Sequence, residues 1–122
     1  MTRAINVLVI AFVLVACGAS QRAETIRATY ITTVTAHQAF LIFDHEHEKS
    51  IKDAATSYDQ GRAALDAYRL KSDRVMQLFD GVYKAVAAAL VLNDNPMAFA
   101  NLVEASSLLM DSLRDITGGK LP

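Results

Sequence analysis

Residues 75–96 read VMQLFDGVYKAVAAALVLNDNP, and their pattern predicts a helical fold. Their apolar side chains recur every three or four residues, at Val75, Phe79, Val82, Val86 and Ala89. This spacing places them on one face of an α-helix. The helix is expected to end at residues 93–95, because Asn95 can cap a following helix and Pro96 can occupy its first position. The stretch therefore predicts an amphipathic helix, a turn and the start of a second helix.

The seven-residue spacing continues upstream of this stretch. From Ser20 to Leu92 the chain has no proline, and its only glycines are Gly61 and Gly81. One position of the repeat holds Tyr30, His37, Asp44, Ile51, Tyr58, Leu65, Ser72, Phe79 and Val86. Its partner position holds Ile26, Thr33, Phe40, His47, Ala54, Gly61, Tyr68, Val75, Val82 and Ala89. The mostly apolar stripe predicts a buried helix face.

A single helix over residues 22–92 would be about 105 Å long at 1.5 Å per residue, which is too long for so small a domain. Breaks are therefore expected within it. Ser72 followed by Asp73 predicts a helix start after a break near Lys71. The polar run at residues 44–50 is a second candidate for a break.

The last helix is expected to run from Pro96 to Thr117 and to end at Gly118 and Gly119. Its apolar stripe holds Phe99, Leu102, Ser106, Leu109, Leu113 and Ile116. We expect the core between the last two helices to contain Phe79, Val82, Val86, Leu102, Leu109 and Leu113. The predicted fold is all-α, an up-and-down bundle of three or four helices that follows a cleaved signal peptide.

Composition limits the classes of function. A chain of 122 residues fits one domain, and 52% hydrophobic residues exclude a disordered chain. Lys and Arg number 12 against 13 Asp and Glu, so there is no basic footprint for a nucleic acid. Cys17 is the only cysteine, which excludes an intrachain disulfide and a zinc site built from several cysteines.

The N-terminus has the pattern of a secretory signal peptide. One cation, Arg3, precedes the ten apolar residues 7–16. A membrane-spanning helix needs roughly 20 apolar residues, so this run is too short to span. The residues that end it, Leu14-Val15-Ala16-Cys17, resemble the lipobox of bacterial lipoproteins.

This resemblance covers about the first 18 residues and implies cleavage before Cys17, which then carries fatty acyl chains such as palmitate. Residues 1–16 would be the signal peptide, and residues 17–122 a single helical domain tethered by lipid at Cys17. In lipoproteins of this kind Asp after the cysteine favours retention in the inner membrane. Gly18 therefore favours the periplasmic face of the outer membrane if the host is Gram-negative.

All three histidines lie within residues 37–47, and helical spacing puts His37, Asp44, His47 and Glu48 on the buried face. His45 and Glu46 are expected in solvent. Imidazole and carboxylate groups three or four residues apart can bind a divalent metal. However, His37 lies near 10 Å from the other candidates along the helix axis, so we expect no tight metal site. The alternatives are a buried hydrogen-bonded or register-fixing network, a solvated segment or a bend.

No catalytic constellation is recognisable, since lipidation would consume Cys17 and the hydroxyls of Ser106 and Ser107 lack a base partner. The sequence therefore predicts a non-catalytic envelope lipoprotein without a cofactor that contacts the membrane through its lipid and acts on another envelope protein. A homo-oligomer remains open. Two alternatives are a metal-binding bundle that uses His37, Asp44 and His47, and an envelope lysis or exclusion lipoprotein from a phage or plasmid.

Overall fold

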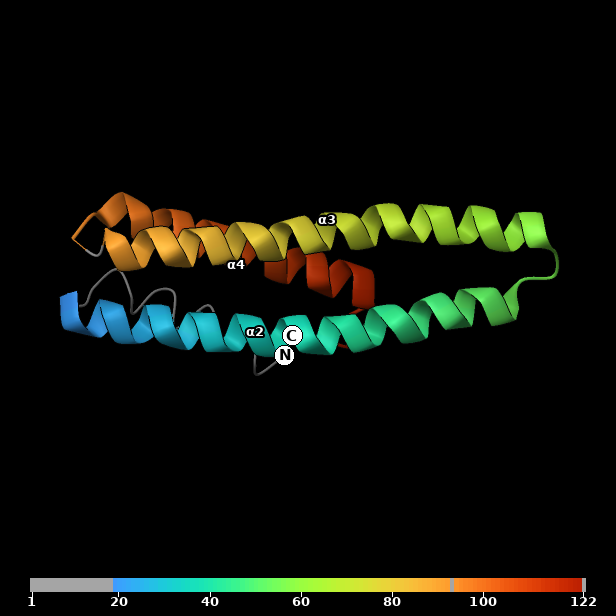
Figure 1. The fold of residues 1–122 in the computed structure, drawn as a ribbon, viewed down its shortest axis with the longest axis horizontal. Coiled ribbons are helices and arrows are strands. Elements are labelled where there is room, and N and C mark those ends of the chain that lie inside the picture. The colour runs from blue at the N-terminus through green and yellow to red at the C-terminus, as the bar shows by residue number, and fades with distance from the viewer. Residues whose placement is uncertain (1–18, 93, 122) are drawn as a thin grey trace.

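A computed structural model describes residues 19–92 and 94–121, and this part of the chain is almost entirely helical. Its elements are α2 (Ala19–Ala54), α3 (Tyr58–Val91) and α4 (Pro96–Thr117). Helices α2 and α3 form a long antiparallel hairpin, and α4 folds back along α3 (Figure 1). The all-α prediction is confirmed for the described ranges. The expected signal peptide and Cys17 lie outside them.

The hairpin turns at residues 55–57, and both breaks expected upstream of residue 75 are wrong. Ser57 caps α3, because its hydroxyl accepts a 3.2 Å hydrogen bond from the backbone N–H of Gln60. The Gln60 side chain in turn accepts a 3.0 Å bond from the Thr56 N–H. Neither Lys71 nor the run 44–50 interrupts a helix. Ser72 does not act as a cap, because its hydroxyl bonds to the neighbouring helix instead.

The turn before Pro96 is confirmed. The Asn95 side chain accepts a 2.9 Å hydrogen bond from the Met97 N–H, and Pro96 occupies the first turn of α4. At the other end of α4, Gly118 has a φ of 63°, a left-handed conformation that glycine adopts without strain. Capping chemistry thus fixes both ends of α4.

The core lies where the three helices meet. All six residues expected there, from Phe79 to Leu113, are at most 4% exposed, so that prediction is confirmed. Helix α2 adds Ile26 and Phe40, both fully buried. Burying such side chains is the dominant favourable contribution to folding.

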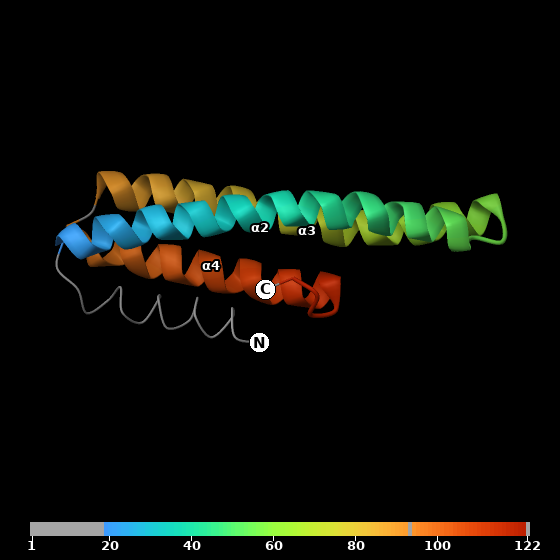
Figure 2. The ribbon, with the colours of Figure 1, turned by 90° about the horizontal axis from the view of Figure 1, so that it is seen from below.

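Helix α4 is much shorter than the hairpin. At 1.5 Å per residue, the 22 residues of α4 span about 33 Å and the 34 residues of α3 about 51 Å. Helix α4 therefore covers only the part of the hairpin next to the α3–α4 turn, as both views show (Figures 1 and 2). Residues 48–69 continue beyond it as two paired helices, here called the arm. None of the helices in the described ranges is long and apolar enough to cross a membrane.

Candidate functional site

A polar network links α2 and α3 where the arm begins. One carboxylate oxygen of Asp44 accepts a 2.6 Å hydrogen bond from the Ser72 hydroxyl and a 2.9 Å bond from the Tyr68 hydroxyl. Ser72 and Tyr68 are buried, at 5% and 7% exposure. One turn further along α2, Glu48 pairs with Arg69 at 3.1 Å. Asp44 therefore joins the two helices by hydrogen bonds within their shared face.

The histidines on this face have separate surroundings. The Nδ1 atom of His37 lies 2.9 Å from the Tyr83 hydroxyl, and its ring stacks on Phe79 with centroids 4.5 Å apart. His37 Nε2 is buried and has no hydrogen-bond partner. The His47 ring contacts Phe43 and Tyr68 at centroid distances of 5.3 and 4.5 Å. Both rings therefore fill space between the helices.

The candidate metal ligands do not gather into one site. Within residues 19–92 and 94–121, no group of three or more His, Cys, Asp and Glu side chains is placed to hold a metal ion. Asp44, Glu48 and His37 each have a partner on α3. Of the alternatives for this cluster, the structure thus shows a hydrogen-bonded network, and its bonds run between α2 and α3. His45 and Glu46 are exposed, as expected.

Burial between the helices raises the pKa of two tyrosines. Burial raises the pKa of Tyr68 well above its ordinary value, and the hydrogen bond to Asp44 and the charges of Asp44 and Glu48 raise it further. Burial also raises the pKa of Tyr83, with a smaller contribution from Tyr30. Both phenols therefore stay protonated, and remain available as hydrogen-bond donors, to a higher pH than an ordinary tyrosine.

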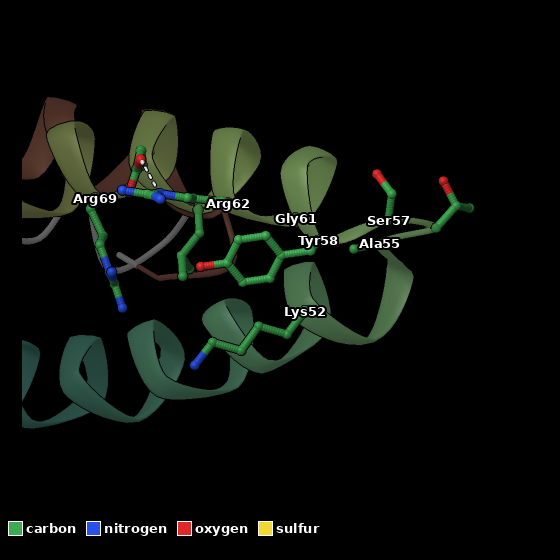
Figure 3. Close-up of a pocket in the computed structure, with 10 residues that line it drawn as sticks. Lys52, Ala55, Ser57, Tyr58, Gly61, Arg62 and Arg69 are labelled. Atoms are coloured by element: carbon green, nitrogen blue, oxygen red, sulfur yellow. Dashed lines mark ion pairs between the residues drawn. The ribbon is translucent and has the colours of Figure 1, made fainter.

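The hairpin turn forms an open groove at the far end of the arm, here called the tip groove (Figure 3). Its volume is about 740 Å³. The last turn of α2, the connection and the first turns of α3 line it with Lys52, Ala55, Thr56, Ser57, Tyr58, Gly61, Arg62, Leu65, Asp66 and Arg69. The close-up shows Lys52 and Tyr58 extending from opposite helices into the space between α2 and α3. A cavity of this size lies within the range of small-ligand sites.

The charges that line the tip groove are mainly positive. Lys52, Arg62 and Arg69 face one acid, Asp66. Asp66 lies 3.9 Å from the Arg62 guanidinium, and both side chains are largely exposed. Within the described ranges Lys52 has no ion-pair partner. Arg62 is paired with Asp66 and Arg69 with Glu48, so Lys52 is the groove cation best placed to pair with a carboxylate or phosphate group.

The arm as a whole is electrically balanced, which makes this positive charge local. Residues 48–69 contain four acids and four bases. The acids are Glu48, Asp53, Asp59 and Asp66, and the bases are Lys49, Lys52, Arg62 and Arg69. The arm therefore favours a single anionic group at the groove over an extended anionic surface. The tip groove could not be predicted from the sequence pattern, because it depends on a helix break at residues 55–57 that was not expected.

Comparison with known proteins gives no relative. The chain matches no protein-family model, no curated protein sequence and no solved structure.

Proposed function

We propose that this chain is a lipid-anchored lipoprotein of the bacterial cell envelope that acts through protein contacts and has no catalytic activity. One observation carries the proposal, the sequence Leu14-Val15-Ala16-Cys17 at the end of the apolar run 7–16. Cleavage before Cys17 would leave this cysteine two residues ahead of Ala19, the first residue of α2. The lipid would then be attached almost directly to the hairpin.

The length of the hairpin supports a role in which it holds the tip groove at a distance from the membrane. The 36 residues of α2 span about 54 Å from the anchored end to the tip groove. Attachment at Cys17 places the lipid at one end of α2, and the arm occupies the other end (Figure 2). The arm would hold the tip groove away from the periplasmic face of the membrane. An envelope protein that presents an anionic group is the partner that fits the groove.

The lipid anchor is tested by replacing Cys17 with Ser in the full-length gene. The unchanged chain should fractionate with membranes and carry the mass of acyl chains after cleavage at residue 16. The variant should accumulate as an unprocessed precursor or enter the soluble fraction. Normal processing and membrane fractionation of the Cys17→Ser variant would refute the proposal.

The protein contact is tested in living cells by placing a photo-crosslinking phenylalanine analogue at Tyr58, which is 77% exposed in the groove. A protein adduct of defined mass is expected on illumination. Lys52→Glu should abolish this adduct, because it reverses the charge beside Tyr58. Lys49→Glu is the matched control, since Lys49 is exposed on the same arm but does not line the groove. Equal loss of the adduct in both variants would argue against a groove-specific contact.

A further inference from the structure

Four large apolar side chains are exposed where α3 turns into α4. Their exposed fractions are 46% for Leu90, 82% for Val91, 49% for Leu92 and 65% for Met97. They come from the last turn of α3, its C-cap and the first turn of α4. We call these four residues the apolar end. Single exposed apolar side chains are common on proteins, but neighbouring ones at one end of a molecule indicate a contact surface.

The sequence around the apolar end is nearly free of charge. Between Lys84 and Glu104 the chain reads AVAAALVLNDNPMAFANLV, with Asp94 as its only charged residue. Asp94 is exposed in the turn itself. A protein surface that carries charges contacts hydrocarbon only at a cost in free energy, because its charges must leave water. Within residues 85–103 this cost arises only at Asp94, and Arg22 of α2 adds a further charge at this end of the molecule.

The apolar end lies at the same end of the molecule as the start of α2. Figures 1 and 2 both show the first turns of α2 beside the α3–α4 turn. The guanidinium of Arg22 lies 5.4 Å from the centre of the Phe99 ring, which joins the first turns of α2 and α4 directly. Covalent geometry limits the separation of the Cα atoms of Cys17 and Ala19 to about 7 Å. An acyl chain on Cys17 would therefore enter the bilayer next to the apolar end.

We propose that the apolar end docks on the lipid surface and holds the hairpin upright on the membrane. The proposal rests on the lipid anchor proposed above. A lipid surface is the occupant that fits, because the anchor would keep this end, and not the arm, against the bilayer. Apolar side chains at a membrane interface strengthen an acyl anchor by removing further apolar area from water.

Asp94 limits how deeply the apolar end enters. Its carboxylate stays in the aqueous headgroup layer, since charged groups are costly within the hydrocarbon. The Asn95 side chain already accepts a hydrogen bond from the α4 backbone and so needs no partner in the lipid for that oxygen. The contact is therefore shallow, and Val91, the most exposed of the four apolar side chains, should enter furthest.

The test uses the full-length gene, with the processed protein purified from membranes and reconstituted into phosphatidylcholine–phosphatidylglycerol vesicles. Acylation consumes the thiol of Cys17, so an introduced cysteine is the only one that can be labelled. Val91→Cys and Ala63→Cys, an exposed position in the arm, are each coupled to an environment-sensitive fluorophore. A quencher attached to the lipid tails should extinguish the label at position 91 and leave the label at position 63 bright. Circular dichroism checks that both variants keep the helical fold.

The outcomes separate the two proposals, because mass spectrometry of the same samples reports acylation independently. An acylated protein whose label at position 91 stays bright overturns the docking and leaves the anchor intact. Equal quenching at both positions means that the hairpin lies flat, which also overturns it. If the label at position 91 is already shielded from water without vesicles, and the protein has the mass of a dimer, then the apolar end binds a second copy of the chain and the docking is overturned. A protein without acyl mass refutes the anchor and, with it, the docking that rests on the anchor.

Discussion

The Ser72 hydroxyl of α3 donates a 2.6 Å hydrogen bond to the Asp44 carboxylate of α2. Both residues occupy the apolar stripe of their helix, and Ser72 is only 5% exposed. A hydrogen bond to a charged group contributes more to stability than one between neutral groups. The bond also favours one alignment of the two helices, because Asp44 accepts from both Ser72 and Tyr68 in this alignment.

Removing this hydroxyl tests its contribution. Ser72→Ala should lower the free energy of unfolding by about 1–2 kcal/mol, because the lost hydrogen bond outweighs the gain in helix propensity. Ser107→Ala is the matched control, since Ser107 is exposed on α4. It should change stability by less than about 0.5 kcal/mol. Urea unfolding followed by circular dichroism measures both, and equal effects would show that the interhelical bond contributes nothing.

The raised pKa of Tyr68 predicts a dependence of stability on alkaline pH. Burial, and then the hydrogen bond to Asp44, raise this pKa above the unfolded value of about 10, so the fold favours the protonated phenol. Its contribution is fully present below about pH 10 and is lost as the pH rises through the folded pKa. The unchanged protein should therefore lose more stability above about pH 10 than Tyr68→Phe does. Urea unfolding at a series of alkaline pH values measures this, and parallel curves would contradict the prediction.

The two helical glycines should respond oppositely to alanine. A methyl group at Gly61 would lie 2.9 Å from the Cβ of Ala55 across the hairpin turn, whereas one at Gly81 meets no atom within 4 Å. Gly81→Ala should raise stability by about 1 kcal/mol through helix propensity. Gly61→Ala should be less stable than Gly81→Ala by about 1–3 kcal/mol, because it forces the turn apart. Thermal unfolding of the two variants checks the order, and equal stabilities would show that the turn tolerates the methyl group.

The buried stripe of α4 should dominate its stability. Leu102 is 1% exposed and Leu108 is 51% exposed on the same helix. Leu102→Ala should cost about 2–5 kcal/mol, because it leaves a cavity between α3 and α4. Leu108→Ala should cost less than about 1 kcal/mol. Chemical denaturation compares the two, and a loss below about 0.5 kcal/mol at Leu102 would place that side chain in solvent.

We expect zinc to bind weakly to the cluster at residues 37–48. A zinc site takes about four ligands, or three and a water. In the structure Asp44 already bonds to two hydroxyls, and His37 Nδ1 lies beside the Tyr83 hydroxyl. Calorimetric titration of the purified protein with zinc, iron, copper and nickel should therefore show no sub-micromolar binding. Tight binding that disappears in His47→Ala would establish a metal site.

Local chemistry made part of the fold predictable. Asn95 and Pro96 act within one helical turn, so the sequence alone indicates where α4 begins. The seven-residue spacing likewise identifies the buried side of α3 and α4. The hairpin turn was harder to recognise, because residues 55–57 contain neither proline nor glycine. Ser57 followed three residues later by Gln60 was the available signal, since this pair resembles a capping box.

The contacts of the polar cluster could not be predicted, because they depend on how α2 and α3 align. Ser72 has the residue type of a helix cap, yet it lies opposite Asp44 once the hairpin closes and serves as a donor between helices. The spacing of Asp44 and His47 along one helix says nothing about which hydroxyls face them from another. The same alignment brings Lys52 and Arg69 to one groove from positions 17 residues apart.

Because α4 is short, the two ends of the α2–α3 hairpin differ in how easily their helices separate. Residues in the arm have one helical neighbour, whereas those beside α4 contribute to a core shared by three helices. Amide hydrogens in the arm can therefore exchange with solvent through separation of two helices, without loss of the main core. The molecule should open from its tip and hold longest near the α3–α4 turn. A ligand in the tip groove would contact both helices of the hairpin at the place where they separate most easily. Its binding would slow amide hydrogen exchange along the whole arm.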